Sequence, residues 1–270
     1  MLRAYLDASQ TVGPPTVPGP PLLAVAGFVG ESDQSARGQG RWSAALSKAG
    51  AECFHMTDFE AKQEPPWSEW TEQKRRGVLD RLVTLTASSV LMGTAAVVRM
   101  DDYDGLAKDV RRRVGSPYLL AACACVSAIA RWCEGQGIDE KVMYVFEGGD
   151  LGLPQFREAP AQLVEKSDDF KNRMRLLSIT VGSKRDVPLL QMAGILAWEV
   201  THHMPRCLGF DSTPARRSME RLLEAVPVEA EYFDARALRA AADRHTPEDY
   251  ARAAEIFGMA MKADRKSPDL

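Results

Sequence analysis

The chain opens with the stretch Leu2-Arg3-Ala4-Tyr5-Leu6-Asp7, in which apolar residues alternate with Arg3 and Tyr5. This alternation predicts a β-strand with one buried face. Asp7 stands at the C-terminal end of the expected strand, although aspartate is depleted in strands because it competes for backbone hydrogen bonds. Two interpretations of Asp7 are open: it starts a turn, or it is a metal-binding carboxylate held at the end of a sheet.

The composition indicates a globular protein. Of the 270 residues, 45% are hydrophobic and 26% charged, which is enough apolar material to fill a sizeable core. The net charge of −3 argues against a cationic coat for nucleic acid, but it leaves room for a local basic groove. No apolar run approaches the ~20 residues that span a bilayer, and no signal-peptide pattern opens the chain. Five scattered cysteines are typical of reduced thiols, so we expect a cytoplasmic protein that does not bind membranes.

Strands and helices alternate along the first three quarters of the chain. A Pro- and Gly-rich segment at 12–21 predicts a long hairpin connection to a second, antiparallel strand at 22–29. Further strands are expected at 90–98, 141–146 and 176–181, and helices at 36–49, 71–87, 118–134 and 189–203. This order predicts an α/β protein whose mixed sheet is covered by helices on both faces.

The last quarter of the chain is charged and Ala-rich. Helices are expected there at 213–225, 234–244 and 246–262. We therefore divide the chain into an α/β domain at 1–205 and a helical C-terminal extension at 206–270.

A second carboxylate ends the strand at 141–146, because Glu147-Gly148-Gly149-Asp150 follows it directly. Carboxylates that converge at one edge of a sheet are what two-metal phosphodiester chemistry requires, and Mg²⁺ is a hard ion that takes one or two of them. We therefore expect Asp7 and Glu147 on adjacent strand ends, with Mg²⁺ or Mn²⁺ as the cofactor.

Two further segments carry polar residues at helical spacing. His55 and Asp58 are three residues apart, which places them on one face of a helical turn, either as a local hydrogen bond or as part of a site. The apolar helix at 189–203 contains Gln191, Glu199 and the pair His202-His203. Adjacent histidines have the wrong spacing for joint metal binding on one helix face, so we interpret them as cations at the helix end.

Three motifs resemble one protein family. Tyr5-Leu6-Asp7-Ala8-Ser9 resembles a YxDESG-like opening, and Phe54-His55-Met56-Thr57-Asp58-Phe59 resembles an FHxxDF-like segment. Ser183-Lys184 followed by the stretch from Pro188 to Glu199 resembles an SK…LQxADxxAxE-like end. These motifs belong to the domain of unknown function 3800, a mainly bacterial family with a ribonuclease H-like fold and no settled activity. The resemblance covers residues 1–205.

The resemblance implies roles for individual residues. It implies metal-carboxylate roles for Asp7 and for Glu147 or Asp150, and it marks four further site residues: His55, Asp58, Lys184 and Gln191. We expect the catalytic set to be Asp7, Glu147, Lys184 and Gln191.

Two positions depart from the family pattern. Ala8 stands where an acidic residue is expected, and Gly194 stands where the helix should carry an aspartate. Glu199 lies about 140° further around the helix, so it cannot simply replace that aspartate. Asp186, on the loop before the helix, is the better substitute, although it is equally suited to starting the helix.

Two functions are therefore open. One is a metal-dependent nuclease or related phosphoryl-transfer enzyme acting on nucleic acid. The other is a ribonuclease H-like module that has lost full metal binding and serves as a binding or interaction protein. The absent carboxylate at Gly194 favours the second, and the retained Asp7, Glu147, Lys184 and Gln191 favour the first.

Overall fold

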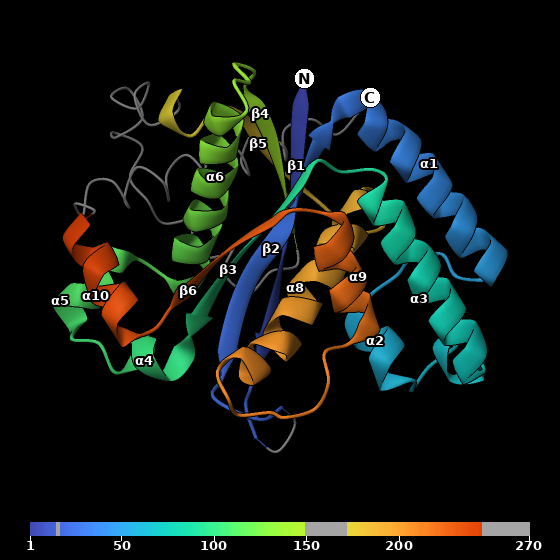
Figure 1. The fold of residues 1–270 in the computed structure, drawn as a ribbon, viewed down its shortest axis with the longest axis horizontal. Coiled ribbons are helices and arrows are strands. Elements are labelled where there is room, and N and C mark those ends of the chain that lie inside the picture. Colours follow the sequence, from blue (N-terminus) through green and yellow to red (C-terminus); the bar gives the residue numbers. More distant parts are fainter. Residues whose placement is uncertain (15–16, 149–171, 245–270) are drawn as a thin grey trace.

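A computed structural model describes residues 1–14, 17–148 and 172–244. Its centre is a six-stranded sheet in the order β5-β4-β1-β2-β3-β6 (Figure 1). β1 and β3 both run antiparallel to β2, which lies between them, whereas β4 runs parallel to β1, β5 to β4, and β6 to β3. The strands are β1 Leu2–Thr11, β2 Leu22–Glu31, β3 Met92–Arg99, β4 Val142–Glu147, β5 Leu176–Gly182 and β6 Val228–Phe233. The predicted α/β class with a mixed sheet is confirmed.

The first hairpin is longer than the sequence predicts. β1 continues past Asp7 to Thr11, and Asp7 pairs with Ala26 in the middle of the hairpin. On its other side, β1 pairs with β4 only as far as Leu6 opposite Phe146. Asp7 is therefore not at the end of its strand, because the long antiparallel partner β2 supports four more residues. It does lie at the end of the parallel pairing with β4.

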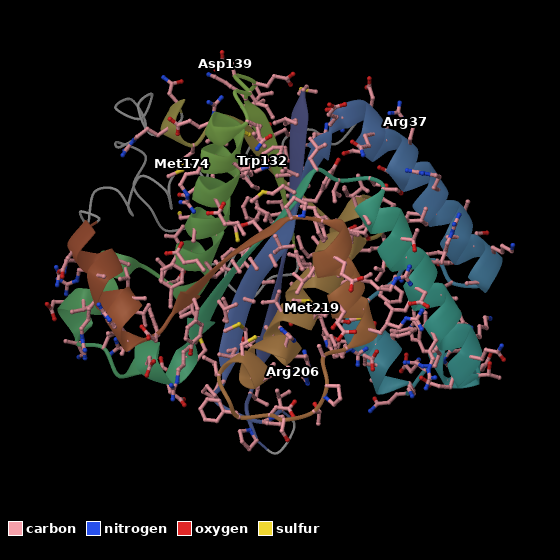
Figure 2. The ribbon with its side chains drawn as sticks, viewed as in Figure 1. Arg37, Trp132, Asp139, Met174, Arg206 and Met219 are labelled. Carbon is pink, nitrogen blue, oxygen red and sulfur yellow. The ribbon has the colours of Figure 1, made fainter. Side chains whose placement is uncertain are left out.

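Helices cover both faces of the sheet, as predicted. Alternate residues of β1 face opposite ways: Leu6 belongs to an apolar cluster with α6, and Tyr5 belongs to a cluster with α8. Side chains fill the space between the helices and the sheet (Figure 2). The helices are α1 Ser32–Ala49, α2 Met56–Ala61, α3 Glu72–Ala87, α4 Met100–Asp104, α5 Lys108–Val114, α6 Pro117–Gly135, α8 Leu189–Cys207, α9 Arg217–Ala225 and α10 Ala235–Arg244, with a short 3₁₀ turn at Trp67–Glu69.

One helical stretch has the length and composition of a membrane span. Among the described residues, Lys108–Gly135 passes this test, contrary to our expectation that no apolar run is long enough. In this structure α6 packs against the sheet, its cysteines Cys125 and Cys133 lie in the core, and 61% of the apolar window is buried. A mostly buried core helix satisfies the same criterion, so this stretch is weak evidence for a membrane.

The end of α8 and the segment after it differ from the prediction. α8 runs on to Cys207, so His202 and His203 lie more than a turn before its end and do not cap it. Burial lowers the pKa of both imidazoles, which disfavours the cationic form we expected. Residues 228–233, expected as a link between helices, form the edge strand β6. The helix expected at 246–262 lies outside the described residues.

Candidate active-site cleft

The carboxylates of Asp7 and Glu147 belong to adjacent parallel strands. Each residue follows directly after the pair Leu6 and Phe146, which face the α6 side. Because side chains alternate along a strand, Asp7 and Glu147 both point toward the α8 side. Neighbouring strands are only ~4.8 Å apart, so the register brings these two positions next to each other, as expected.

Asp7 is a buried ion-paired carboxylate. Its side chain is 1% exposed, and its Oδ2 lies 2.7 Å from Nζ of Lys184, on the loop after β5. Its Oδ1 accepts a hydrogen bond of 2.9 Å from the backbone N–H of Ala8. Burial raises the pKa of Asp7, and the Lys184 ammonium group opposes that rise. Lys184 therefore offsets part of the cost of burying the Asp7 carboxylate.

Gly194 faces this same ion pair from α8. A Cβ atom at this position would lie 2.6 Å from Oδ2 of Asp7 and 3.3 Å from Cε of Lys184. Because glycine has no side chain, position 194 provides the space that the Asp7–Lys184 pair occupies. Close packing explains why a glycine stands here, and this weakens the argument that a metal ligand has simply been lost.

Gln191 holds the elements around the site together. Its Oε1 accepts hydrogen bonds of 2.9 Å from the indole N–H of Trp42 and from the backbone N–H of Phe54. Its Nε2 donates to the backbone oxygen of Lys184 at 2.6 Å. Gln191 therefore positions the loop that carries Lys184 and does not itself reach into the cleft. Trp42, on α1, was not predicted as part of this arrangement.

An open cleft of about 980 Å³ borders Lys184, the cation of this pair. Its lining includes Lys184, Glu147, His55 and Asp58. His55 Nδ1 lies 3.3 Å from Asp58 Oδ2, so the expected one-face arrangement of these two residues is present. The charged lining consists of four carboxylates and two cations: Glu52, Asp58, Glu69, Glu147, Lys184 and Arg185. With a neutral imidazole, the cleft carries a net charge of −2.

Of the other two proposed metal ligands, the one that the structure describes, Asp186, is absent from the lining of this cleft. The carboxylate of Asp186 is exposed and accepts a hydrogen bond of 2.6 Å from the hydroxyl of Ser183, which is a local loop contact. Asp150 lies outside the described residues. Within the described ranges no group of three or more His, Cys, Asp or Glu side chains is arranged to hold a metal ion.

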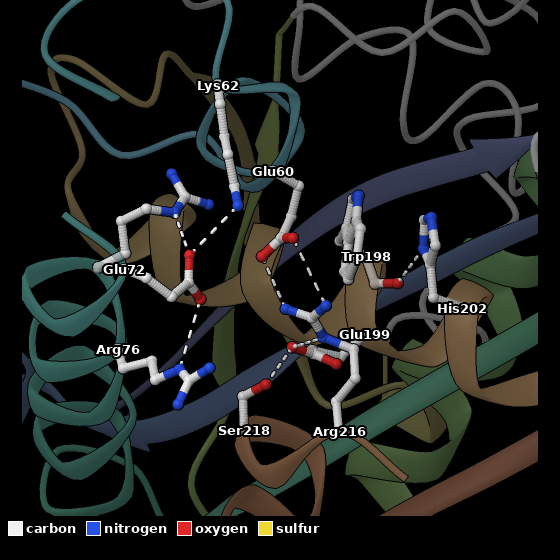
Figure 3. A network of polar contacts seen from close by, with 10 residues as sticks. Glu60, Lys62, Glu72, Arg76, Trp198, Glu199, His202, Arg216 and Ser218 are labelled. Atoms are coloured by element: carbon white, nitrogen blue, oxygen red, sulfur yellow. Dashed lines mark hydrogen bonds and ion pairs between the residues drawn. The ribbon is translucent and has the colours of Figure 1, made fainter. Parts of the chain in front are cut away.

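Glu199 belongs to a separate network (Figure 3). It is fully buried, and its Oε1 accepts hydrogen bonds from Nε of Arg216 at 3.3 Å and from the hydroxyl of Ser218. Arg216 also reaches Glu60 at 2.7 Å and lies 4.8 Å above the ring of Trp198. Burial raises the pKa of Glu199, against the effect of the Arg216 charge. The structure therefore does not bring Glu199 to the cleft.

Comparison with known proteins adds no assignment. No family model matches the sequence, and no curated protein matches it at a significant level. The resemblance noted above therefore depends on the three motifs alone. Each motif contributes at least one residue near Asp7: Asp7 itself, His55, and Lys184.

Proposed function

We propose that this chain is a ribonuclease H-like protein that cleaves phosphodiester bonds of nucleic acid with the help of a divalent metal ion. The three-stranded antiparallel unit β1-β2-β3, extended by parallel β4 and β5, supports that fold. The observation that carries the proposed activity is that Asp7 and Glu147 each follow the paired residues Leu6 and Phe146 on adjacent strands, with Glu147 in the lining of a large open cleft.

The two carboxylates Asp7 and Glu147 suit an open metal site that is completed by water and substrate. Two neighbouring carboxylates do not make a closed cage, and Gly194 supplies no third ligand. Mg²⁺ and Mn²⁺ fit such a pair, because Mg²⁺ usually keeps several waters and takes one or two carboxylates together with substrate phosphates. Asp7 and Glu147 would hold the ion, which supplies Lewis-acid activation of the phosphate and a more acidic water.

The chain's own residues would prepare the cleft for a phosphodiester. The negative lining repels bare phosphates, so a substrate strand enters together with cations. Lys184 Nζ, on a side chain that is 16% exposed, can move from Asp7 to a phosphate oxygen when another cation takes its place. Gln191 keeps the backbone of Lys184 in position, and the half-buried His55 contributes its imidazole to the wall of the cleft.

A second candidate function is supported by the ion pair itself. Lys184 already neutralises Asp7, and α8 approaches so closely at Gly194 that a further ligand there has no space. A module of this kind would use its acidic cleft to bind a cationic segment of a partner and would not cleave anything.

Thermal unfolding with and without Mn²⁺, beside a cleavage assay on labelled single- and double-stranded oligonucleotides, separates the two functions. We expect Mn²⁺ to raise the Tm of the wild type and to support cleavage. Asp7→Asn and Glu147→Gln should lose both responses. Glu69→Gln is the matched control, because Glu69 is an exposed carboxylate of the same cleft that lies outside the sheet.

The outcomes are distinct. If the wild type shows neither a shift in Tm nor cleavage, the enzyme proposal is wrong and the binding module remains. An equal loss in Glu69→Gln would mean that the cleft attracts ions only through its overall charge.

A further inference from the structure

A second pocket of about 390 Å³ lies on the other side of α2 from the cleft, between the end of α2, the first turns of α3 and the start of α9. Figure 3 shows Lys62, Glu72 and Arg76 on one side of this region and Arg216 and Ser218 on the other. Its volume lies within the range of small-molecule sites. Neither the proposed activity nor the carboxylates Asp7 and Glu147 involve it.

The pocket has an excess of positive charge. Five cationic side chains and three carboxylates line it, which leaves a net charge of +2. Glu72 alone is shared among Lys62 at 3.2 Å, Arg76 at 3.4 Å and Arg75 at 3.6 Å. One carboxylate cannot neutralise three cations, so the region attracts anions.

Arg75 is the least expected of these residues. Its side chain is only 4% exposed, and its guanidinium carbon lies 3.9 Å from the centre of the Phe59 ring. Its Nε and Nη1 atoms are buried and make no hydrogen bond in the part of the chain that the structure describes, although Nε forms the 3.6 Å ion pair with Glu72. A buried guanidinium donor such as Nη1 without a hydrogen-bond partner is costly, and Arg75 belongs to the lining of this pocket.

The first residues of α9 face the same pocket. Arg217 and Ser218 line it, and the capping residue Arg216 makes no side-chain hydrogen bond that caps the helix. The N–H groups of a helix's first turn lack intrahelical acceptors, and the helix dipole favours a negative charge beside them. The helix start and the buried arginine therefore point to the same class of ligand.

We propose that this pocket binds the phosphate group of a small phosphorylated molecule. A phosphate dianion matches the net charge of the lining, and its oxygens suit the planar donor fork of Arg75. Lys62, Arg76 and Arg217 surround the charged group, while Phe59 and Leu79 offer apolar surface to the organic part. This inference does not depend on the proposed nuclease activity.

Isothermal titration of the full chain tests the proposal, with inorganic phosphate, ribose 5-phosphate and ribose as probes. We expect inorganic phosphate and ribose 5-phosphate to bind and ribose not to bind. Arg75→Met keeps the apolar contact with Phe59 but removes the donors, and it should weaken phosphate binding about tenfold or more. Arg81→Gln, an exposed change on α3 outside the pocket, should bind as the wild type does.

Two further measurements complete the test. If Arg75→Met does not fold, the surface variants Lys62→Gln and Arg217→Gln decide, since each should weaken binding several-fold. An oligonucleotide with a 5′-phosphate, compared with one ending in a hydroxyl, shows whether the phosphate source is a nucleic-acid end or a free metabolite. The proposal is overturned if neither phosphate binds at concentrations up to about 10 millimolar, which corresponds to a very weak dissociation constant. It is also overturned if Arg81→Gln weakens phosphate binding as much as Arg75→Met does.

Discussion

Asp7 and Glu199 are both buried carboxylates on the α8 side of the sheet, yet their surroundings differ. Asp7 has one cationic partner, the lysine Lys184, and that lysine lines an open cleft. Glu199 has the arginine Arg216 and the hydroxyl of Ser218, and it has no place in that cleft. A lysine is a flexible point charge, whereas an arginine is a planar fork that holds several acceptors at once.

This difference separates an exchangeable charge from a structural one. In the proposed function Lys184 would leave Asp7 when another cation arrives, and its side chain, which is 16% exposed, borders solvent. Arg216 bridges Glu60 and Glu199 while it also covers Trp198, so its movement would break three contacts together. We therefore propose that the Asp7–Lys184 pair is exchangeable, although removing its lysine without a replacement is costly, and that the Arg216 bridge is structural.

The largest expected effect comes from Lys184→Met, which leaves Asp7 buried without a cation. Removing one partner of a buried ion pair destabilises proteins by about 3–5 kcal/mol, less if the remaining carboxyl takes up a proton. Urea unfolding at pH 7 measures the change. Arg185→Met, the exposed neighbour, should change stability by less than about 0.5 kcal/mol, and equal effects of both would contradict the assignment.

Arg216→Met should have the next largest effect, about 2 kcal/mol. The loss is smaller than for Lys184 because Arg216 is 38% exposed and Ser218 still donates to Glu199. Thermal unfolding checks it, with Arg217→Met as the matched change of the adjacent, more exposed arginine. If Arg217→Met is as destabilising as Arg216→Met, the bridge between Glu60 and Glu199 contributes nothing.

Gly194→Ala should destabilise by about 1–3 kcal/mol, since overpacking forces neighbours to move. The new Cβ would lie 2.6 Å from the Asp7 carboxylate. Gly77→Ala in α3 is the control, because nothing lies within 4 Å of its Cβ position and alanine stabilises helix interiors by up to about 1 kcal/mol. A stabilising effect at both positions would show that Asp7 moves aside without cost.

The smallest expected effect concerns pH. Burial lowers the pKa of His202, whose ring stacks on Trp198 with 3.5 Å between the centroids. Between the lowered folded pKa and the usual value near 6.5, the unfolded chain binds a proton that the folded chain refuses, so stability falls as the pH falls through this window. Stability curves from pH 7.5 to pH 5 should be shallower for His202→Phe than for the wild type. Identical slopes would exclude this contribution.

Much of the architecture could be predicted because its signals are local. Period-two alternation identified β1, and the Pro- and Gly-rich connection predicted its antiparallel pairing with β2. Strand β6 was missed because Val228–Phe233 is a half-exposed edge strand with glutamates at alternate positions, and its partner β3 is far away in the sequence. Edge strands of this kind have only a weak local pattern.

The sequence alone determined which residues were available: two strand-borne carboxylates, a lysine-bearing loop, and an apolar helix with a glutamine and a glycine one turn apart. Only the tertiary structure decided that Lys184 pairs with Asp7, that Gln191 holds the loop of Lys184, and that Gly194 leaves space for the pair. It also placed Glu199 with Arg216, and it put Arg75 in the lining of a pocket with two buried donors that make no hydrogen bond. The reason is physical: periodicity is a property of neighbours in the chain, whereas a charge finds its partner through distances that only the packed fold sets.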